Sequence, residues 1–152
     1  MCSKSRAGER AHRIKHGIEG AFNKGLSVYF VTFTIPRQKC IQTARKEVSA
    51  RWKNMSKLFT RWTRKTGIKT HYARALDVTF KKYNYHERYH LHIHAVIVLD
   101  ESKVLELYPK QSTIESILIE QWKELNRKGM MCKTVSQDVQ KVSNSIQDSG
   151  RA

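Results

Sequence analysis

Three histidines alternate along one short stretch of the chain, at His90, His92 and His94. The segment 89–99 that holds them is rich in β-branched and apolar residues, which predicts a β-strand. Side chains two residues apart on a strand share a face, with Cα atoms about 6.6 Å apart. Two imidazoles at that spacing can bind one metal ion, so the pattern predicts a metal site on one face of a sheet.

A metal ion held by two histidines needs a further ligand, and Asp77 is the only acidic residue of the strand-like segment 72–81. A polar link centred near Asn84 predicts an antiparallel hairpin, which places Asp77 across from His92 or His94. A carboxylate ligand favours Mg²⁺ or Mn²⁺, and such an ion polarises a phosphate oxygen. The alternative interpretation is that these histidines are ordinary surface or core residues.

The other segments predict the elements that must position this site. Apolar residues recur at helical spacing or in strand-like runs, which predicts helices over 3–24, 43–66 and 112–128 and strands over 27–35, 72–81 and 89–99, with a last short strand holding Val135, Val139 and Val142. Ser112 and Glu115 fit a capping box. The strand 27–35 is apolar on both faces and is expected at the centre of the sheet. We expect an α+β fold, an antiparallel sheet of about four to five strands with helices packed on it.

The charge of the chain points to a polyanionic partner. Lys and Arg number 29 against 13 Asp and Glu, which gives a net charge of +16. Neutralising phosphates releases counterions, so nucleic acid is the expected partner. The basic residues expected to contact it are Lys53, Lys57, Arg61, Arg64, Lys81, Lys82 and Arg88. Charge alone separates neither DNA from RNA nor an enzyme from a binding protein.

Composition excludes several classes. No apolar run approaches the roughly 18 residues of a membrane span, and the basic N-terminal segment 1–13 lacks the apolar stretch of a secretory signal. We therefore expect a cytoplasmic protein without a membrane partner. The three cysteines Cys2, Cys40 and Cys132 lie far apart, which does not suit a disulfide framework.

Three segments, taken in order, resemble the rolling-circle replication initiators of plasmids, which belong to the HUH endonuclease superfamily. Residues 30–36 resemble the family's first motif, a strand ending in threonine, a hydrophobic residue and proline. Residues 74–80 resemble its Arg-Ala-Leu-Glu-Val-Thr strand, with Asp77 at the position of the glutamate. Residues 90–94 resemble its His-Pro-His-hydrophobic-His motif, with Leu91 in place of proline.

The resemblance implies that His92 and His94 are the metal-binding pair. Thr32 and Thr34 are expected on a strand beside them, in a packing role. It also implies a tyrosine nucleophile on a helix well after the histidine strand. The last tyrosine of the chain is Tyr108, which comes early for that pattern. Tyr108 is thus the candidate nucleophile within these residues, although its position favours a packing role and a nucleophile beyond Ala152. We interpret 1–142 as a nuclease domain of a truncated chain and 143–152 as a tail.

Three functions compete. The first is a rolling-circle initiator, a metal-dependent nicking endonuclease and strand transferase for single-stranded or origin DNA that works with host replication proteins. The second is a DNA-binding module without catalysis, which the missing tyrosine favours. The third is an RNA-binding protein, which explains the charge but leaves three alternating histidines unexplained.

Overall fold

The computed structural model describes residues 3–83, 86–124 and 136–143, with side chains from residue 6 onward except at 81–87. Its elements follow one another in the order α1 (Ser3–Asn23), β1 (Ser27–Thr34), α2 (Ile41–Thr66), β2 (His71–Tyr83), β3 (His86–Leu99), α3 (Glu101–Glu106), α4 (Ile114–Glu124) and β4 (Asp138–Lys141). The α+β class is confirmed, with four antiparallel strands in one sheet and helices packed on it.

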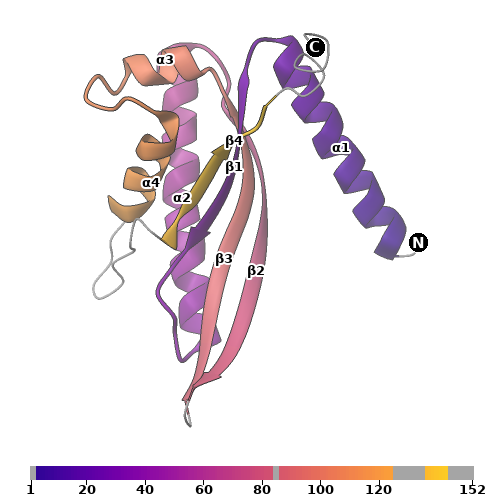
Figure 1. Ribbon diagram of the computed structural model, residues 1–152, viewed down its shortest axis with the longest axis vertical. Coiled ribbons are helices and arrows are strands. Elements are labelled where there is room, and N and C mark those ends of the chain that lie inside the picture. The colour runs from indigo at the N-terminus through magenta and orange to yellow at the C-terminus, as the bar shows by residue number, and fades with distance from the viewer. Residues whose placement is uncertain (1–2, 84–85, 125–135, 144–152) are drawn as a thin grey trace.

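The strands lie in the order β2-β3-β1-β4, so β1 is interior, as its apolar faces predict (Figure 1). The β2–β3 hairpin is longer than expected, because both strands continue to the pair Tyr83 and His86. The segment 86–88, expected as part of the link between the strands, therefore belongs to β3. Residues 71–80 of the edge strand β2 are exposed, so the polar side chains among them remain in contact with water.

One face of the sheet carries the hydrophobic core. Alternate residues of β1 and β3 point to it and are buried under α2, α3 and α4, among them Val31, Phe33, Leu91 and Ile93. Their neighbours in sequence, including the three histidines, therefore point to the opposite face. We call that opposite side the histidine face; it carries the even-numbered residues of β1 and β3 and the odd-numbered residues of β2.

Helix α2 confirms the expected apolar stripe, because Trp52, Phe59 and Trp62 are buried in the core. The helix ends where predicted, at Gly67, which adopts a left-handed conformation (φ 74°) and donates its N–H to the carbonyl of Thr63. A residue with a side chain is strained in that conformation, so glycine fixes the end of the helix.

The third predicted helix needs correction. A short helix, α3, precedes it and was missed; Asp100 caps α3 by accepting a hydrogen bond from the backbone N–H of Lys103 (3.1 Å). Helix α4 starts at Ile114, and the side chain that accepts a bond from its first turn is Thr113, bound to the N–H of Ser116 (3.2 Å), rather than Ser112. The predicted residues 125–128 and Val135 lie outside the described part of the chain.

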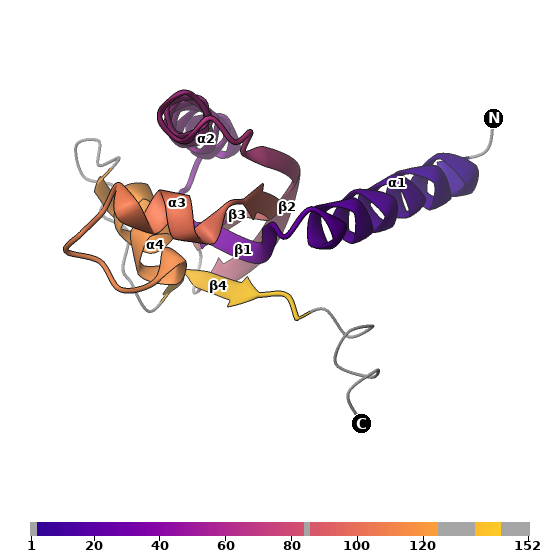
Figure 2. The ribbon, with the colours of Figure 1, turned by 90° about the horizontal axis from the view of Figure 1, so that it is seen from above.

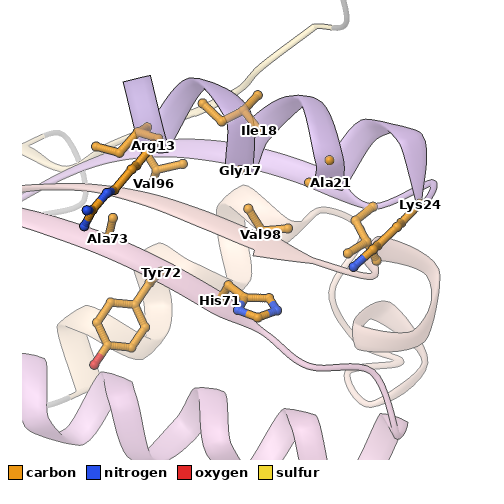
Figure 3. Close-up of a pocket in the computed structure, with 13 residues that line it drawn as sticks. Arg13, Gly17, Ile18, Ala21, Lys24, His71, Tyr72, Ala73, Val96 and Val98 are labelled. Carbon is orange, nitrogen blue, oxygen red and sulfur yellow. The ribbon is translucent and has the colours of Figure 1, made fainter. Parts of the chain in front are cut away.

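Helix α1 projects from the rest of the fold, as the views along and across the sheet show (Figures 1 and 2). Its bounds match the predicted helix 3–24 to within one residue. Its C-terminal half lies over the histidine face, beside Ala73, Val96 and Val98 (Figure 3). Of the helices in the described part of the chain, none is both long and apolar enough to cross a membrane.

Candidate metal and DNA site

Strands β2 and β3 bring Asp77 directly opposite His92. This register confirms the expected hairpin geometry around the candidate metal ligands. The carboxylate Oδ2 of Asp77 lies 3.7 Å from Nε2 of His94, and both side chains are more than half exposed (65% and 51%). The imidazoles of His92 and His94 are nearly parallel, with centroids 6.3 Å apart. Two imidazoles and a carboxylate therefore share one open patch of the histidine face.

Two threonines hold the rings of this patch. Thr32 of β1 lies opposite His94, and its hydroxyl is 3.1 Å from Nδ1 of that ring. Thr79 of β2 has its hydroxyl 2.8 Å from Nε2 of His92. The packing role expected for Thr32 is thus wrong, because its hydroxyl contacts His94. Thr79 was not predicted, although its position two residues after Asp77 places it on the same face. Thr34 instead is buried and bonds to the backbone oxygen of Ser136, a packing role.

The donor set fits a divalent cation, but its side chains are not arranged around one. Within the described residues, no group of three or more His, Cys, Asp or Glu side chains is gathered closely enough to hold a metal ion. The reason lies in the rings: Nε2 of His94 faces Asp77, whereas Nε2 of His92 is occupied by Thr79. A metal ion shared by these side chains would require rotation of His92 away from Thr79, with no change in backbone register.

Burial and neighbouring cations lower the pKa of two of the histidines, which favours their neutral forms. Burial lowers the pKa of His92 below its ordinary value of 6.5; Asp77 opposes the shift, and His94 and Arg37 add to it. Burial also lowers the pKa of His90, with His92 and Arg37 acting in the same direction. A histidine binds metal only in its neutral form, so these pKa shifts favour metal binding at neutral pH.

The threonines give opposite predictions for metal affinity. Thr79→Val frees the metal-binding nitrogen of His92 from a hydrogen bond worth about 1 kcal/mol, so Mn²⁺ is expected to bind about fivefold more tightly. Thr32→Val removes the partner that orients His94 through its other nitrogen, so Mn²⁺ is expected to bind about tenfold more weakly. Calorimetric titration of both variants with Mn²⁺ checks this; shifts of the same sign would contradict the assigned roles.

The structure does not bring Tyr108 to the histidines. It follows α3, and its hydroxyl accepts a hydrogen bond from Nε1 of Trp62 (2.8 Å) against the core, on the side of the sheet opposite His92 and His94. The other tyrosines whose side chains the structure describes, Tyr29, Tyr72 and Tyr89, also contact the core. The packing role considered for Tyr108 is the role that the structure gives it.

The predicted DNA-binding residues fall into separate regions. Lys53, Lys57, Arg61 and Arg64 are exposed on α2, which covers the face of the sheet opposite the histidines. Arg88 shares the histidine face, two residues before His90. The side chains of Lys81 and Lys82 lie outside the described ones. Arg37, which the sequence did not single out, is close enough to lower the pKa of both His90 and His92. The cations beside the candidate metal ligands are therefore Arg37 and Arg88, and not the predicted lysines and arginines of α2.

Comparisons with known proteins do not assign this chain to a family. No protein-family model matches the chain, and no curated protein matches it. Among solved structures the chain is similar to a de novo designed protein, Foldit4, at 15% sequence identity and a TM-score of 0.31, over 78% of this chain and 97% of that one. A likeness this weak carries no argument about function.

Proposed function

We propose that this chain is a metal-dependent nicking domain for single-stranded DNA, of the rolling-circle initiator type. The observation that carries the proposal is the exposed patch in which His92, His94 and Asp77 share one face of two paired strands. Exposure suits a substrate as large as a DNA strand, which has to lie across the sheet. The net charge of +16 supports a phosphate-bearing substrate.

His92, His94 and Asp77 would hold Mg²⁺ or Mn²⁺, which neutralises charge on the phosphate as phosphorus is attacked. The hydroxyl of Thr32 holds the ring of His94 through its Nδ1, so that Nε2 of the same ring stays directed toward Asp77. Arg37, which acts on the pKa of His92, and Arg88, which lies on β3, would bind the neighbouring phosphates of the DNA, because arginine makes two parallel hydrogen bonds to a phosphate.

In the reaction that the resemblance implies, a tyrosine oxygen bonds to phosphorus while the bond from phosphorus to the 3′ oxygen breaks. The tyrosine loses its proton, and the leaving 3′ oxygen gains one, so the products are a 5′-phosphotyrosyl link and a free 3′-OH. The four described tyrosine side chains contact the core, on the other side of the sheet from His92. We therefore assign the attacking hydroxyl to a residue other than Tyr29, Tyr72, Tyr89 and Tyr108, which leaves Tyr83 and Tyr85 as the candidates within this chain.

Cleavage of a labelled pool of single-stranded oligonucleotides with Mn²⁺ tests the proposal. We expect shortened DNA, together with a protein–DNA adduct on a denaturing gel, from the unchanged chain but not after removal of Mn²⁺ with a chelator. Tyr108→Phe is expected to leave both products in place, because Tyr108 lies against Trp62. Loss of the adduct in Tyr108→Phe would contradict the assignment of the nucleophile.

The second candidate is a single-strand-binding module without catalysis. Two observations favour it: the described tyrosines are remote from the histidines, and Thr79 occupies Nε2 of His92. Binding of the oligonucleotides without any Mn²⁺-dependent cutting would establish this second function instead of the first.

Phe30 offers a prediction that holds for both candidates. It lies on β1 in the histidine face, opposite Val96, and 46% of it is exposed. An exposed aromatic beside a phosphate-binding patch suits base stacking, which is worth about 1–3 kcal/mol per base. Phe30→Ala is therefore expected to weaken binding of a short oligothymidylate about tenfold in fluorescence anisotropy. An unchanged dissociation constant would exclude Phe30 from the DNA-binding surface.

A further inference from the structure

A groove separates α1 from the sheet at one end of the histidine face. Its volume is ≈ 420 Å³, within the range of pockets that take small organic groups. Gly17 and Ala21 of α1 form one wall, and Ala73, Val96 and Val98 form the other (Figure 3). A Cβ atom built on Gly17 meets no heavy atom within 4 Å, so the groove is open where the helix faces the strands.

Cations flank this apolar groove. Arg13 and Lys24 both belong to its lining and come from opposite ends of it (Figure 3). A nucleotide combines a flat apolar base with a charged phosphate, so apolar walls between two cations match its chemistry. An uncharged apolar ligand would gain nothing from Arg13 and Lys24.

His71 adds a polar group to the groove lining. Burial lowers the pKa of His71, and Lys69 and Lys24 act in the same direction. At pH 7 its ring is therefore neutral, with one nitrogen that donates and one that accepts a hydrogen bond. A nucleobase edge presents both kinds of partner.

The groove lies next to the candidate metal patch along strands β2 and β3. Val96 follows His94 by two residues on β3, and Ala73 precedes by two residues Ala75, the strand partner of His94. A two-residue step along a strand is about 6.6 Å. Phe30, the exposed aromatic of β1, pairs with Val96 at the same level of the sheet. If one phosphate of a single-stranded DNA lies at the histidines, a neighbouring base of that DNA is thus within reach of the groove.

We propose that the groove between α1 and the β2–β3 hairpin binds one base of a single-stranded DNA whose phosphates lie along the histidine face. The proposal rests on the proposed function for the identity of its ligand, a single-stranded DNA. It assigns α1 a direct part in substrate binding, with the base between Gly17 and Ala73 and its flanking phosphates near Arg13 and Lys24.

The test compares two oligonucleotides of equal length and phosphate number in fluorescence anisotropy, one oligothymidylate and one abasic. Gly17→Leu fills the groove, whereas Gly8→Leu is the matched control on the exposed part of the same helix, where a Cβ also meets nothing within 4 Å. We expect Gly17→Leu to weaken oligothymidylate binding about tenfold and to leave abasic binding unchanged. Gly8→Leu is expected to change neither.

The outcomes separate this proposal from the catalytic one, because the assay contains a chelator and no cleavage. Equal binding of both oligonucleotides by the unchanged chain would overturn the base site, whether or not the chain cuts DNA. Retained oligothymidylate affinity in Gly17→Leu would also overturn the base site. The occupant of the groove would then be another segment of this chain. A similar loss for both oligonucleotides in Gly17→Leu would mean that the helix had moved, and would reject the groove as a base site.

Discussion

Replacing His92 and His94 together with alanine is expected to lower the rate of Mn²⁺-dependent cleavage of single-stranded DNA by about 10³-fold or more. Charge neutralisation by a bound cation contributes several kcal/mol to the transition state of phosphoryl transfer, and each 1.4 kcal/mol is a factor of about ten in rate. Removing both imidazoles leaves Asp77 as the one proposed ligand, which is too little to keep the ion in place.

The same variant is expected to keep its fold. His94 is about half exposed, and neither ring belongs to the core beneath Leu91 and Ile93. Circular dichroism should therefore match that of the unchanged chain. His12→Ala/His16→Ala is the matched control, because it removes two exposed imidazoles from α1 instead. Equal loss of cleavage in both variants would show that the effect is general and that the patch is not the site.

Arg51→Ala is expected to lower the free energy of unfolding by about 3–5 kcal/mol. Arg51 is 1% exposed and donates through Nε to the carboxylate of Glu47 (2.8 Å) and through Nη1 to the carbonyl of Trp122 (3.0 Å). The substitution leaves Glu47, itself 6% exposed, as a buried charge without this cation. It also removes the hydrogen bond that joins α2 to α4 at Trp122, whose ring stacks on Phe33.

Urea unfolding monitored by tryptophan fluorescence measures this effect. Replacing both partners, as Arg51→Met with Glu47→Leu, is expected to cost much less than Arg51→Ala, because no charge then remains buried. If the single and the double variant lost the same stability, packing rather than the ion pair would be the reason.

Strand periodicity predicted which side chains share a face. In the segment 89–99, apolar Leu91 and Ile93 alternate with histidines; the structure buries the first set and leaves the histidines half-buried or exposed on the other face. The position of Asp77 followed from the same rule once the hairpin was centred near Asn84. Local periodicity decides these features, which is why sequence sufficed for them.

Features that depend on which element covers which face were not predictable in this way. Nothing in the pattern of α2 says on which side of the sheet it packs, so its cations were grouped with the histidines although they lie on the opposite side. Tyr108 was a candidate only because it is the last tyrosine of the chain, and the packing role that its position favoured is the one the structure shows. Thr79 was missed because threonine is common in strands, and its contact with His92 depends on the register of the pair.

Short elements were also misjudged. Helix α3 spans only 101–106, too few residues for a helical period to stand out, and its signal was the single capping residue Asp100. The ends of β2 and β3 at the hairpin contain polar residues that sequence rules assign to a turn, but the backbone pairing continues through them to Tyr83 and His86.

Titration of the chain with Mn²⁺, followed by electron paramagnetic resonance, tests the central claim most directly. The structure supplies a demanding control. His12 and His16 on α1 are a second pair of exposed imidazoles, with their Nε2 atoms 3.0 Å apart, and could bind an ion by themselves. The titration therefore compares the unchanged chain with His92→Ala/His94→Ala and with His12→Ala/His16→Ala. We predict a single bound Mn²⁺ that is lost in the first variant and kept in the second. Mn²⁺ that stays bound after loss of His92 and His94, and leaves with His12 and His16, would contradict the account.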